Sequence, residues 1–515
     1  MNRTPTIDEL ADRHLVGIDQ TAQQSFLPGR VRVCATEPAV STRAGQLTLW
    51  FMANLLSRQF QVIRRISFDV PTVAMQANIA LFAGRAELAE TLVATVKAVA
   101  GEKIEVVNPG SYHGSDDITV WVGHNPEGQR GSTRTIVVWG LGWKVFSGAN
   151  DGFHPLNTAT DNPLGSIYAA CIAAGDCFRY ITNWADKGRE LVPDRYISLW
   201  DGKLEHSWSE LPEGSWPETV NLPPFYLCGA GAVGQALVAA LALCPKRTGN
   251  AVILDHDIID GTNLNRYPLS HLETIDANKS EIAVRYLRSE LFSVEPVSKR
   301  WEDYLVQGPH RSSKPVFVKT ESRYKYELFI SCVDNNEARH AIQNYWPRII
   351  LGGSTFRLGA QIMRYDALGG GECLKCNNPL QAKQTIEKRA AALRALPREQ
   401  LDAALAALSP SKQEAVLKYL YEPKCGMVAE KYIDDLGRHA NREFAVGFTS
   451  VGAGIILAGA LVQHSLGVDA LFNRMQNSLN ASFENNSIHT DFFPRLSECT
   501  CSSEIEKIYN KLWGM

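Results

Sequence analysis

The sequence predicts an α/β protein made of two doubly wound, Rossmann-like units that form a pseudo-dimer within one chain. Three observations predict this fold class. Helix-like and strand-like segments alternate over residues 30–185, and the alternation restarts at residue 225. A glycine-rich turn follows the first strand of the second series. Residues 380–422 then interrupt that series with a charged stretch rich in alanine and leucine, which predicts a small helical insert.

In the N-terminal half, apolar residues change repeatedly between helical spacing and short continuous runs. These patterns predict helices at 43–60, 87–100 and 162–181, and strands at 62–70, 118–123 and 135–140. Such alternation predicts a layer of parallel strands covered by helices.

The second half repeats the alternation. We expect strands at 225–228, 250–255, 328–333 and 348–354, and helices at 233–243, 279–291, 336–344 and 448–466. Both halves end in a long helix of small residues, 162–181 and 448–466, which suggests a diverged internal duplication.

The expected domain limits follow from this pattern. Residues 200–224 are rich in Gly, Pro, Ser and Trp and predict an ordered connection. We therefore expect an N-terminal α/β domain at 1–220. The second domain takes residues 221–379 and 426–515, and the insert with its crossover loop takes residues 380–425.

Composition excludes several classes of protein. The chain has 515 residues, 21% charged residues and a net charge of -3, so nothing indicates nucleic-acid or anionic-membrane binding. We find no apolar run of the roughly 18 residues that span a bilayer, and no apolar signal core near the N-terminus. We expect a cytoplasmic protein whose eleven cysteines stay reduced.

The glycine-rich turn is Gly229-Ala-Gly231-Ala232-Val-Gly234, between a buried strand and a helix. Glycines at this spacing allow a tight turn and bring the backbone close to a phosphate at a helix N-terminus. The turn alone would be typical of a dehydrogenase, so the residues after it decide the class.

Charged groups follow in a set order. Asp255 lies at the end of the second strand, where a carboxylate accepts hydrogen bonds from ribose hydroxyls. Asp257, Asn263, Arg266 and Lys279 come next. A hydride-transfer site has no use for so many phosphate-binding groups, whereas attack on a phosphorus atom needs charge neutralised as pyrophosphate leaves.

A further acidic residue ends the third strand. Asp334 could hold Mg²⁺ against phosphate oxygens, with Asn335 beside it. Taken alone, the Asp334-Asn335 pair would be a helix N-cap, and Arg266 and Lys279 would be surface charges.

The string GxGxxG, D-x-D, T-N-L-N-R, K and C-V-D-N-x-x-x-R over residues 225–515 resembles the adenylating domain of ubiquitin-activating-type (ThiF-type) enzymes. It is also similar to bacterial adenylyltransferases that act on sulfur carriers. The resemblance implies that Asp255 binds ribose, that Asn263, Arg266 and Lys279 lie near the phosphates, and that Asp334 binds magnesium or ATP. Tyr267 departs from the family, which usually has Gln there.

The resemblance implies one reaction. The C-terminal glycine carboxylate of a ubiquitin-like protein attacks the α-phosphate of ATP and gives an acyl adenylate and pyrophosphate. Transfer to a conjugating-enzyme-like protein would follow. Because the chain is far shorter than the large eukaryotic enzymes, a bacterial antiviral system is one expected setting.

Two cysteine pairs have metal-ligand character: Cys373-x-x-Cys376 and Cys499-x-Cys501. Four thiolates make a closed tetrahedral zinc site, and the family often has a zinc knuckle at these two places. The alternative is a set of reduced thiols without metal. We expect Cys34, Cys171, Cys177, Cys228, Cys244 and Cys332 to be core residues.

Cys425 follows the helical insert, after Lys424 and before Gly426. In the resembling family a cysteine here takes the acyl group as a thioester, because a thiolate can attack the mixed anhydride while AMP leaves. Lys424 would favour the thiolate. The alternative is a loop cysteine without a role, as in some sulfur-carrier enzymes.

The N-terminal half resembles the inactive partner domain of eukaryotic activating enzymes, because it keeps the alternation and lacks the glycines. In that family an arginine from the opposite subunit often reaches the triphosphate, and the candidates are Arg43, Arg58, Arg64 and Arg65. A separate substrate-binding domain is the alternative for this half. Alternatives for the whole chain are a sulfur-carrier adenylyltransferase, a small-molecule or peptide adenylating enzyme, and an NAD-binding module.

Overall fold

The computed structural model describes residues 23–107, 116–126, 134–149, 159–190, 192–307, 327–366, 369–376, 378, 390–391, 393–405, 410–421, 444–473, 475–503 and 507. The chain divides into two compact units. One takes residues 1–378 and 445–515 and holds both sheets, and the other takes residues 379–444.

The N-terminal sheet has eight strands in the order β3-β2-β1-β4-β5-β6-β7-β8. Its first five strands are parallel, and β6 to β8 add antiparallel pairs. The strands are β1 (Arg30–Ala35), β2 (Arg65–Asp69), β3 (Glu105–Val107), β4 (Ile118–Val122), β5 (Arg134–Leu141), β6 (Lys144–Gly148), β7 (Arg195–Ser198) and β8 (Lys203–Glu205). The helices are α3 (Glu37–Val40), α4 (Arg43–Ser57), α5 (Leu88–Ala100) and α6 (Leu164–Thr182).

The second sheet follows the order β12-β11-β10-β13-β14-β15-β16-β17, with the short strand β9 (Val220–Asn221) beside β11. Its strands are β10 (Phe225–Cys228), β11 (Arg247–Leu254), β12 (Phe292–Val297), β13 (Leu328–Ser331), β14 (Ile349–Phe356), β15 (Gly359–Asp366), β16 (Ser478–Ser482) and β17 (Ser487–Asp491). The helices are α7 (Ala232–Ala242), α8 (Lys279–Leu287), α9 (Trp301–Gln307), α10 (Asn336–Gln343), α15 (Gly447–Ser465) and α16 (Thr500–Ser503).

The two sheets share one topology. In each, the first strand lies between the second and fourth, five strands run parallel, and three antiparallel strands follow. A 19-residue helix precedes the last two strands in both, α6 in one and α15 in the other. This correspondence supports the internal duplication that the sequence suggests.

Every segment predicted from the sequence forms the expected type of element, within a few residues at each end. The prediction of a parallel layer is incomplete, because each sheet ends in antiparallel strands. The helix expected over 279–291 ends at Leu287, since Arg288 has an extended backbone.

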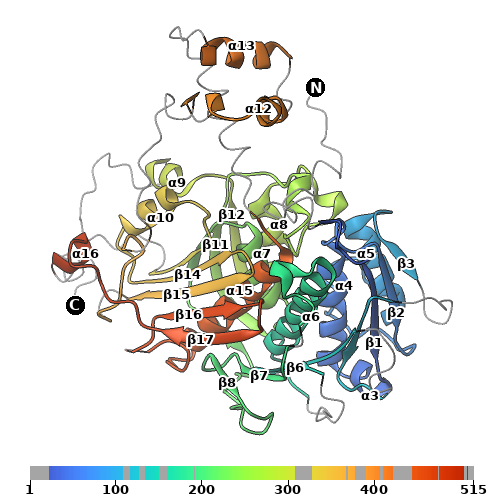
Figure 1. Ribbon diagram of the computed structural model, residues 1–515. Helices are drawn as coiled ribbons and strands as arrows, with labels where there is room; N and C mark the ends of the chain where they lie inside the picture. The colour runs from blue at the N-terminus through green and yellow to red at the C-terminus, as the bar shows by residue number, and fades with distance from the viewer. Residues whose placement is uncertain are drawn as a thin grey trace. The chain divides into compact units, whose positions relative to one another are not determined.

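Four helices join the two halves. α15 packs against α6 and α7, and α6 packs against α4 (Figure 1). A Cβ on Gly454 would lie 2.4 Å from the Cβ of Ala236, so the small residues of α15 and α7 allow close helix contact. The small-residue composition of these helices therefore follows from the interface they form.

We expected no apolar segment long enough to span a bilayer, and judged by length and composition alone this expectation is wrong. α15 is long and apolar enough, but 94% of its 18-residue window is buried inside the protein. Its apolar surface is covered by α6, α7 and β14, as expected of a core helix.

One face of the second sheet carries an aromatic-rich core. Alternate residues of β10, Tyr226 and Cys228, pack with Phe329 of β13 against Trp301 of α9 and Ile342 of α10. Period-two alternation puts the other residues of β10 on the opposite face.

The second unit, residues 379–444, has a hydrophobic core of its own. It includes α12 (Arg398–Leu405) and α13 (Pro410–Tyr421), whose buried residues are Leu401, Leu405, Val416 and Leu420. These two helices agree with the helical insert that the sequence predicts at residues 380–422. The domain limits drawn from the sequence stay predictions.

Candidate active site

The glycine-rich turn lies between β10 and α7. Gly229 has φ of +95°, which L-residues with a side chain rarely adopt. A Cβ on Gly234 would lie 2.2 Å from the Gly229 carbonyl oxygen, so only glycine lets the helix start this close to the strand. Gly231 is the N-cap of α7 and leaves its first N–H groups for an anion.

Asp255 joins this turn to the next strand. Its carboxylate accepts from the Ala230 N–H at 2.8 Å and from the Asp257 N–H at 3.0 Å. Burial raises the pKa of Asp255, while Lys279 and these two N–H groups oppose the shift. The carboxylate thus lies beside the glycine turn, where a nucleotide ribose would be bound.

Lys279 begins α8 and is only 7% exposed. Its ammonium donates to the Asp257 carboxylate at 2.9 Å. Burial disfavours the ammonium, but Tyr267, Asp255 and Asp257 outweigh burial and raise the pKa of Lys279. The lysine is therefore charged at neutral pH and held at the carboxyl ends of β10 and β11.

Arg266 and Asn263 lie on the buried segment between β11 and α8. The Arg266 guanidinium donates to the Thr262 carbonyl oxygen at 2.9 Å and to the Asn265 side chain at 2.7 Å. The Asn263 side chain accepts from the Asp260 N–H at 3.3 Å and closes a short capping box. These bonds fix the segment that would meet the phosphates.

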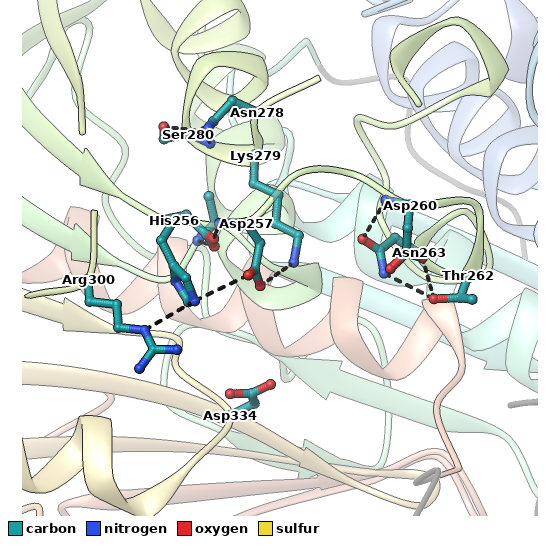
Figure 2. A network of polar contacts seen from close by, with 12 residues as sticks. His256, Asp257, Asp260, Thr262, Asn263, Asn278, Lys279, Ser280, Arg300 and Asp334 are labelled. Carbon is teal, nitrogen blue, oxygen red and sulfur yellow. Dashed lines mark hydrogen bonds and ion pairs between the residues drawn. The ribbon is translucent and has the colours of Figure 1, made fainter. Parts of the chain in front are cut away.

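Asp334 follows β13, the strand on the other side of β10. In Figure 2 its carboxylate points toward the space that also faces Asp257, Lys279 and Arg300. Asn335 is the N-cap of α10, and its side chain accepts from the Ala338 N–H at 2.8 Å. Asn335 thus has the capping role, and Asp334 is exposed and available for a metal.

The site residues therefore gather where the strand order reverses, between β10 and β13. Ligands of open α/β sheets bind at this position. An open glycine turn, a ribose-side carboxylate, two cations and a metal-side carboxylate fit the parts of ATP–Mg²⁺. The metal would neutralise phosphate charge when bound.

Arg58, at the end of α4, is the one arginine of the four candidates that reaches this site from the N-terminal half. It is fully buried and donates to the carbonyl oxygens of Leu264 at 2.6 Å and Ser270 at 2.9 Å. Asn54, one turn earlier, donates to the Pro268 carbonyl oxygen at 3.0 Å. The N-terminal half therefore holds the phosphate-side segment in place.

The other candidate arginines have partners elsewhere. Arg43 donates to the Leu243 carbonyl oxygen, Arg64 to the Phe60 carbonyl oxygen, and Arg65 pairs with Asp116.

Burial lowers the pKa of Arg58 to about 9, still above neutrality, so its guanidinium donates as a cation. Its donors meet backbone carbonyls and Asn54, so its role is to position the segment.

The four predicted zinc ligands meet in space. The Sγ–Sγ distances are 3.8 Å for Cys376–Cys373, 3.6 Å for Cys373–Cys499 and 3.4 Å for Cys376–Cys501. All four sulfurs lie within 4.8 Å of one another. Tetrahedral zinc with Zn–S bonds of about 2.3 Å separates its sulfurs by about 3.8 Å, so this set fits the metal.

Zinc content tests this cluster. We expect about one zinc per chain by elemental analysis, and less than a tenth of that in a Cys376→Ser, Cys501→Ser double variant, because two ligands cannot close a tetrahedral site. Substitution of the buried Cys171 and Cys177 by alanine should leave the zinc content unchanged. Equal zinc in the double variant and the wild type would contradict the assignment.

The remaining cysteines divide into three groups. Cys34, Cys171, Cys177, Cys228 and Cys244 are buried, as expected of core residues. Cys332 is half-buried and lies just after β13, with its carbonyl group against Gly229. Cys425 lies outside the described residues.

Sequence reasoning named Arg58 among four candidate arginines, but it missed Asn54 and the backbone carbonyl groups that both side chains contact. Asn54 lies in α4 and Arg58, four residues later, is its C-cap; the helix residues after Arg43 are buried and mostly apolar. Polar groups at this spacing on an apolar helix must find buried partners, and that was the available signal. Their partners lie more than 200 residues away and could not be identified from spacing.

Comparison with known proteins agrees with this geometry. The ThiF family matches residues 224–501, and the BilD N-terminal domain matches residues 30–190. The chain is 24% identical over 463 residues to the uncharacterized protein y4jF of Sinorhizobium fredii, covering 85% of this chain and 82% of the relative.

Two fungal relatives match a shorter region. Both are named adenylyltransferase and sulfurtransferase UBA4. The protein from Debaryomyces hansenii is 25% identical over 196 residues, 36% of this chain and 40% of its own. The protein from Aspergillus niger is 27% identical over 161 residues, 29% of this chain and 31% of its own. The chain thus spans less than half of either.

Proposed function

Because the chain belongs to the ThiF family, we propose that it is an ATP-dependent adenylating enzyme that activates a ubiquitin-like protein. The carrier's C-terminal glycine carboxylate attacks the α-phosphorus of ATP. The bond from that phosphorus to the bridging oxygen breaks, and pyrophosphate leaves with the electron pair. The products are an acyl adenylate and pyrophosphate, and no redox step is needed.

One observation supports this proposal above the others: two fixed cations, Lys279 and Arg266, lie close to the carboxylate of Asp255 at the glycine turn. Asp255 is fixed to the glycine turn, and Lys279 is held beside it through Asp257. Arg266 lies on the next segment, with its guanidinium 5.1 Å from the Tyr267 ring centroid. A pyrophosphate leaving group needs such fixed positive charge, whereas hydride transfer does not.

For the N-terminal half we propose the role of an inactive partner. The segment equivalent to the glycine turn, between β1 and α4, reads Thr36-Glu-Pro-Ala-Val-Ser-Thr42. It has no glycine, and it has a carboxylate at Glu37 that would repel phosphate. Its contribution is the contact that Asn54 and Arg58 make with the opposite site.

We further propose that Cys425 accepts the acyl group as a thioester and passes it to a conjugating-enzyme cysteine. The support is the chemistry of the residue and its place after the insert. For the setting we propose a cytoplasmic, bacterial antiviral pathway. A neighbouring reading frame for a small protein ending in glycine would support it.

The second candidate is a sulfur-carrier adenylyltransferase without a thioester step. The names of the fungal relatives favour it, because they join adenylyltransferase and sulfurtransferase activities. Both candidates use the same adenylation site and differ only after the adenylate.

Cys425→Ala separates the two candidates. We expect pyrophosphate exchange that depends on a ubiquitin-like protein to be unchanged, because the cysteine is not needed for adenylation. We expect the non-reducing gel band of enzyme plus carrier to disappear, and Cys244→Ala, which removes a buried thiol, to retain it. Retention of a thiol-sensitive band in Cys425→Ala would contradict the thioester proposal.

A further inference from the structure

Tyr267 occupies an unusual position in the candidate site. Its side chain follows Arg266 directly and is 5% exposed. The Arg266 guanidinium carbon lies 5.1 Å from the ring centroid, and the Lys279 ammonium lies 5.4 Å from it. The ring therefore lies against both cations that the proposed reaction needs.

The phenol oxygen of Tyr267 points to the glycine turn. It is the atom nearest to the position of a Cβ on Gly231, at 3.4 Å, with the ring carbon Cζ next at 3.9 Å. Gly231 is the N-cap of α7, an 11-residue helix without a side-chain hydrogen bond at this cap. The hydroxyl thus lies at a helix N-terminus, where an anion is stabilised.

Within the described part of the chain, this hydroxyl has no hydrogen-bond partner, although the backbone of Tyr267 bonds to Asn263 and Ser270. The ring is buried, but the hydroxyl oxygen itself is not fully buried, so it is open to the space beside the glycine turn. A phenol O–H on a largely buried ring usually donates to an acceptor. The hydroxyl is therefore free to donate to an acceptor that the bound substrate supplies.

We propose that the Tyr267 hydroxyl donates a hydrogen bond to a phosphate oxygen of the bound nucleotide, and that its ring fixes Arg266 and Lys279 toward the same phosphates. The proposal rests on the proposed function and names a further residue for it. The glutamine that the resembling family usually has here carries an amide and no aromatic ring. Tyrosine adds the ring face that the two cations share.

The test removes one oxygen atom. In Tyr267→Phe the ring and its two cation contacts remain, and the hydrogen bond to phosphate is lost. A hydrogen bond to a charged group contributes about 1.5–3 kcal/mol, so we expect the Kd for ATP–Mg²⁺ to rise about tenfold or more. The Kd for adenosine, which has no phosphate, should not change.

Tyr196→Phe is the matched control, because it removes a tyrosine hydroxyl from β7 in the other half. It should leave both Kd values unchanged, and the thermal melting of Tyr267→Phe should match the wild type. A second variant, Tyr267→Gln, keeps a hydrogen-bond donor but lacks the ring. Its affinity for ATP should therefore lie between that of the wild type and that of Tyr267→Ala, which has neither.

Two results would overturn the assignment. One is an ATP affinity of Tyr267→Phe equal to that of the wild type, and the other is an equal loss for ATP and adenosine. A wild-type chain that binds ATP but shows no carrier-dependent pyrophosphate exchange would overturn the proposed reaction alone. A wild-type chain that does not bind ATP would overturn both.

Discussion

Lys279→Met should reduce carrier-dependent pyrophosphate exchange about 10²–10³-fold, because it removes a fixed cation from the phosphates of the transition state. The ammonium is buried and held by Asp257, so no reorganisation is needed when charge develops on the leaving pyrophosphate. Methionine keeps a similar length and apolar stem. The measurement is kcat/KM for exchange at saturating carrier protein.

The fold should tolerate this change. The Asp257 carboxylate is 51% exposed and regains water when its partner is removed, so the loss of stability should be about 1 kcal/mol or less. Lys246→Met is the matched control, because Lys246 forms a similar pair with Glu218 at the surface. Exchange by Lys279→Met within a factor of three of the wild type would contradict the assigned role.

Arg58→Met should destabilise the protein by about 2–4 kcal/mol, because it leaves the carbonyl groups of Leu264 and Ser270 buried without donors. Each unsatisfied group costs about 1–3 kcal/mol, and the recovered desolvation of the guanidinium offsets part of that cost. Urea unfolding of the full chain measures the difference. Arg64→Met is the control, because Arg64 is an exposed arginine beyond the end of α4.

The same variant tests whether the N-terminal half positions the site. We expect the KM for ATP to rise several-fold at a temperature where Arg58→Met remains folded, because the segment with Asn263 and Arg266 is no longer fixed. Arg58→Lys, which restores one donor, should recover part of the affinity. An unchanged KM for ATP in a folded Arg58→Met protein would show that the contact only stabilises the fold, and it would contradict the positioning role.

Much of the fold was predictable because its signal is local. Apolar periodicity located helices such as α6 and α15, and the small residues that they share suggested the internal duplication that the common topology of the two sheets supports. The antiparallel strands β6 to β8 and β15 to β17 were harder, because their pairing is set by tertiary contacts and not by their own short sequences.

The site was predictable where chemistry follows the ends of strands. Gly229, Asp255 and Asp334 follow β10, β11 and β13, so parallel pairing alone brings them to one edge. The cysteine pairs were likewise recognisable from spacing, and an antiparallel bridge between Gly371 and Pro494 brings them together. The contact of Asn54 and Arg58 with the distant 264–270 segment could not be predicted, because no local pattern specifies a partner across the interface.

Calorimetric titration of the full chain with ATP–Mg²⁺ and with NAD tests the central claim most directly. A site built for adenylation should bind ATP, respond to Lys279→Met, and give no heat with NAD at the same concentration. Binding of NAD with none of ATP would contradict the account, because a dinucleotide would then occupy the glycine turn and the cations would have no triphosphate to neutralise.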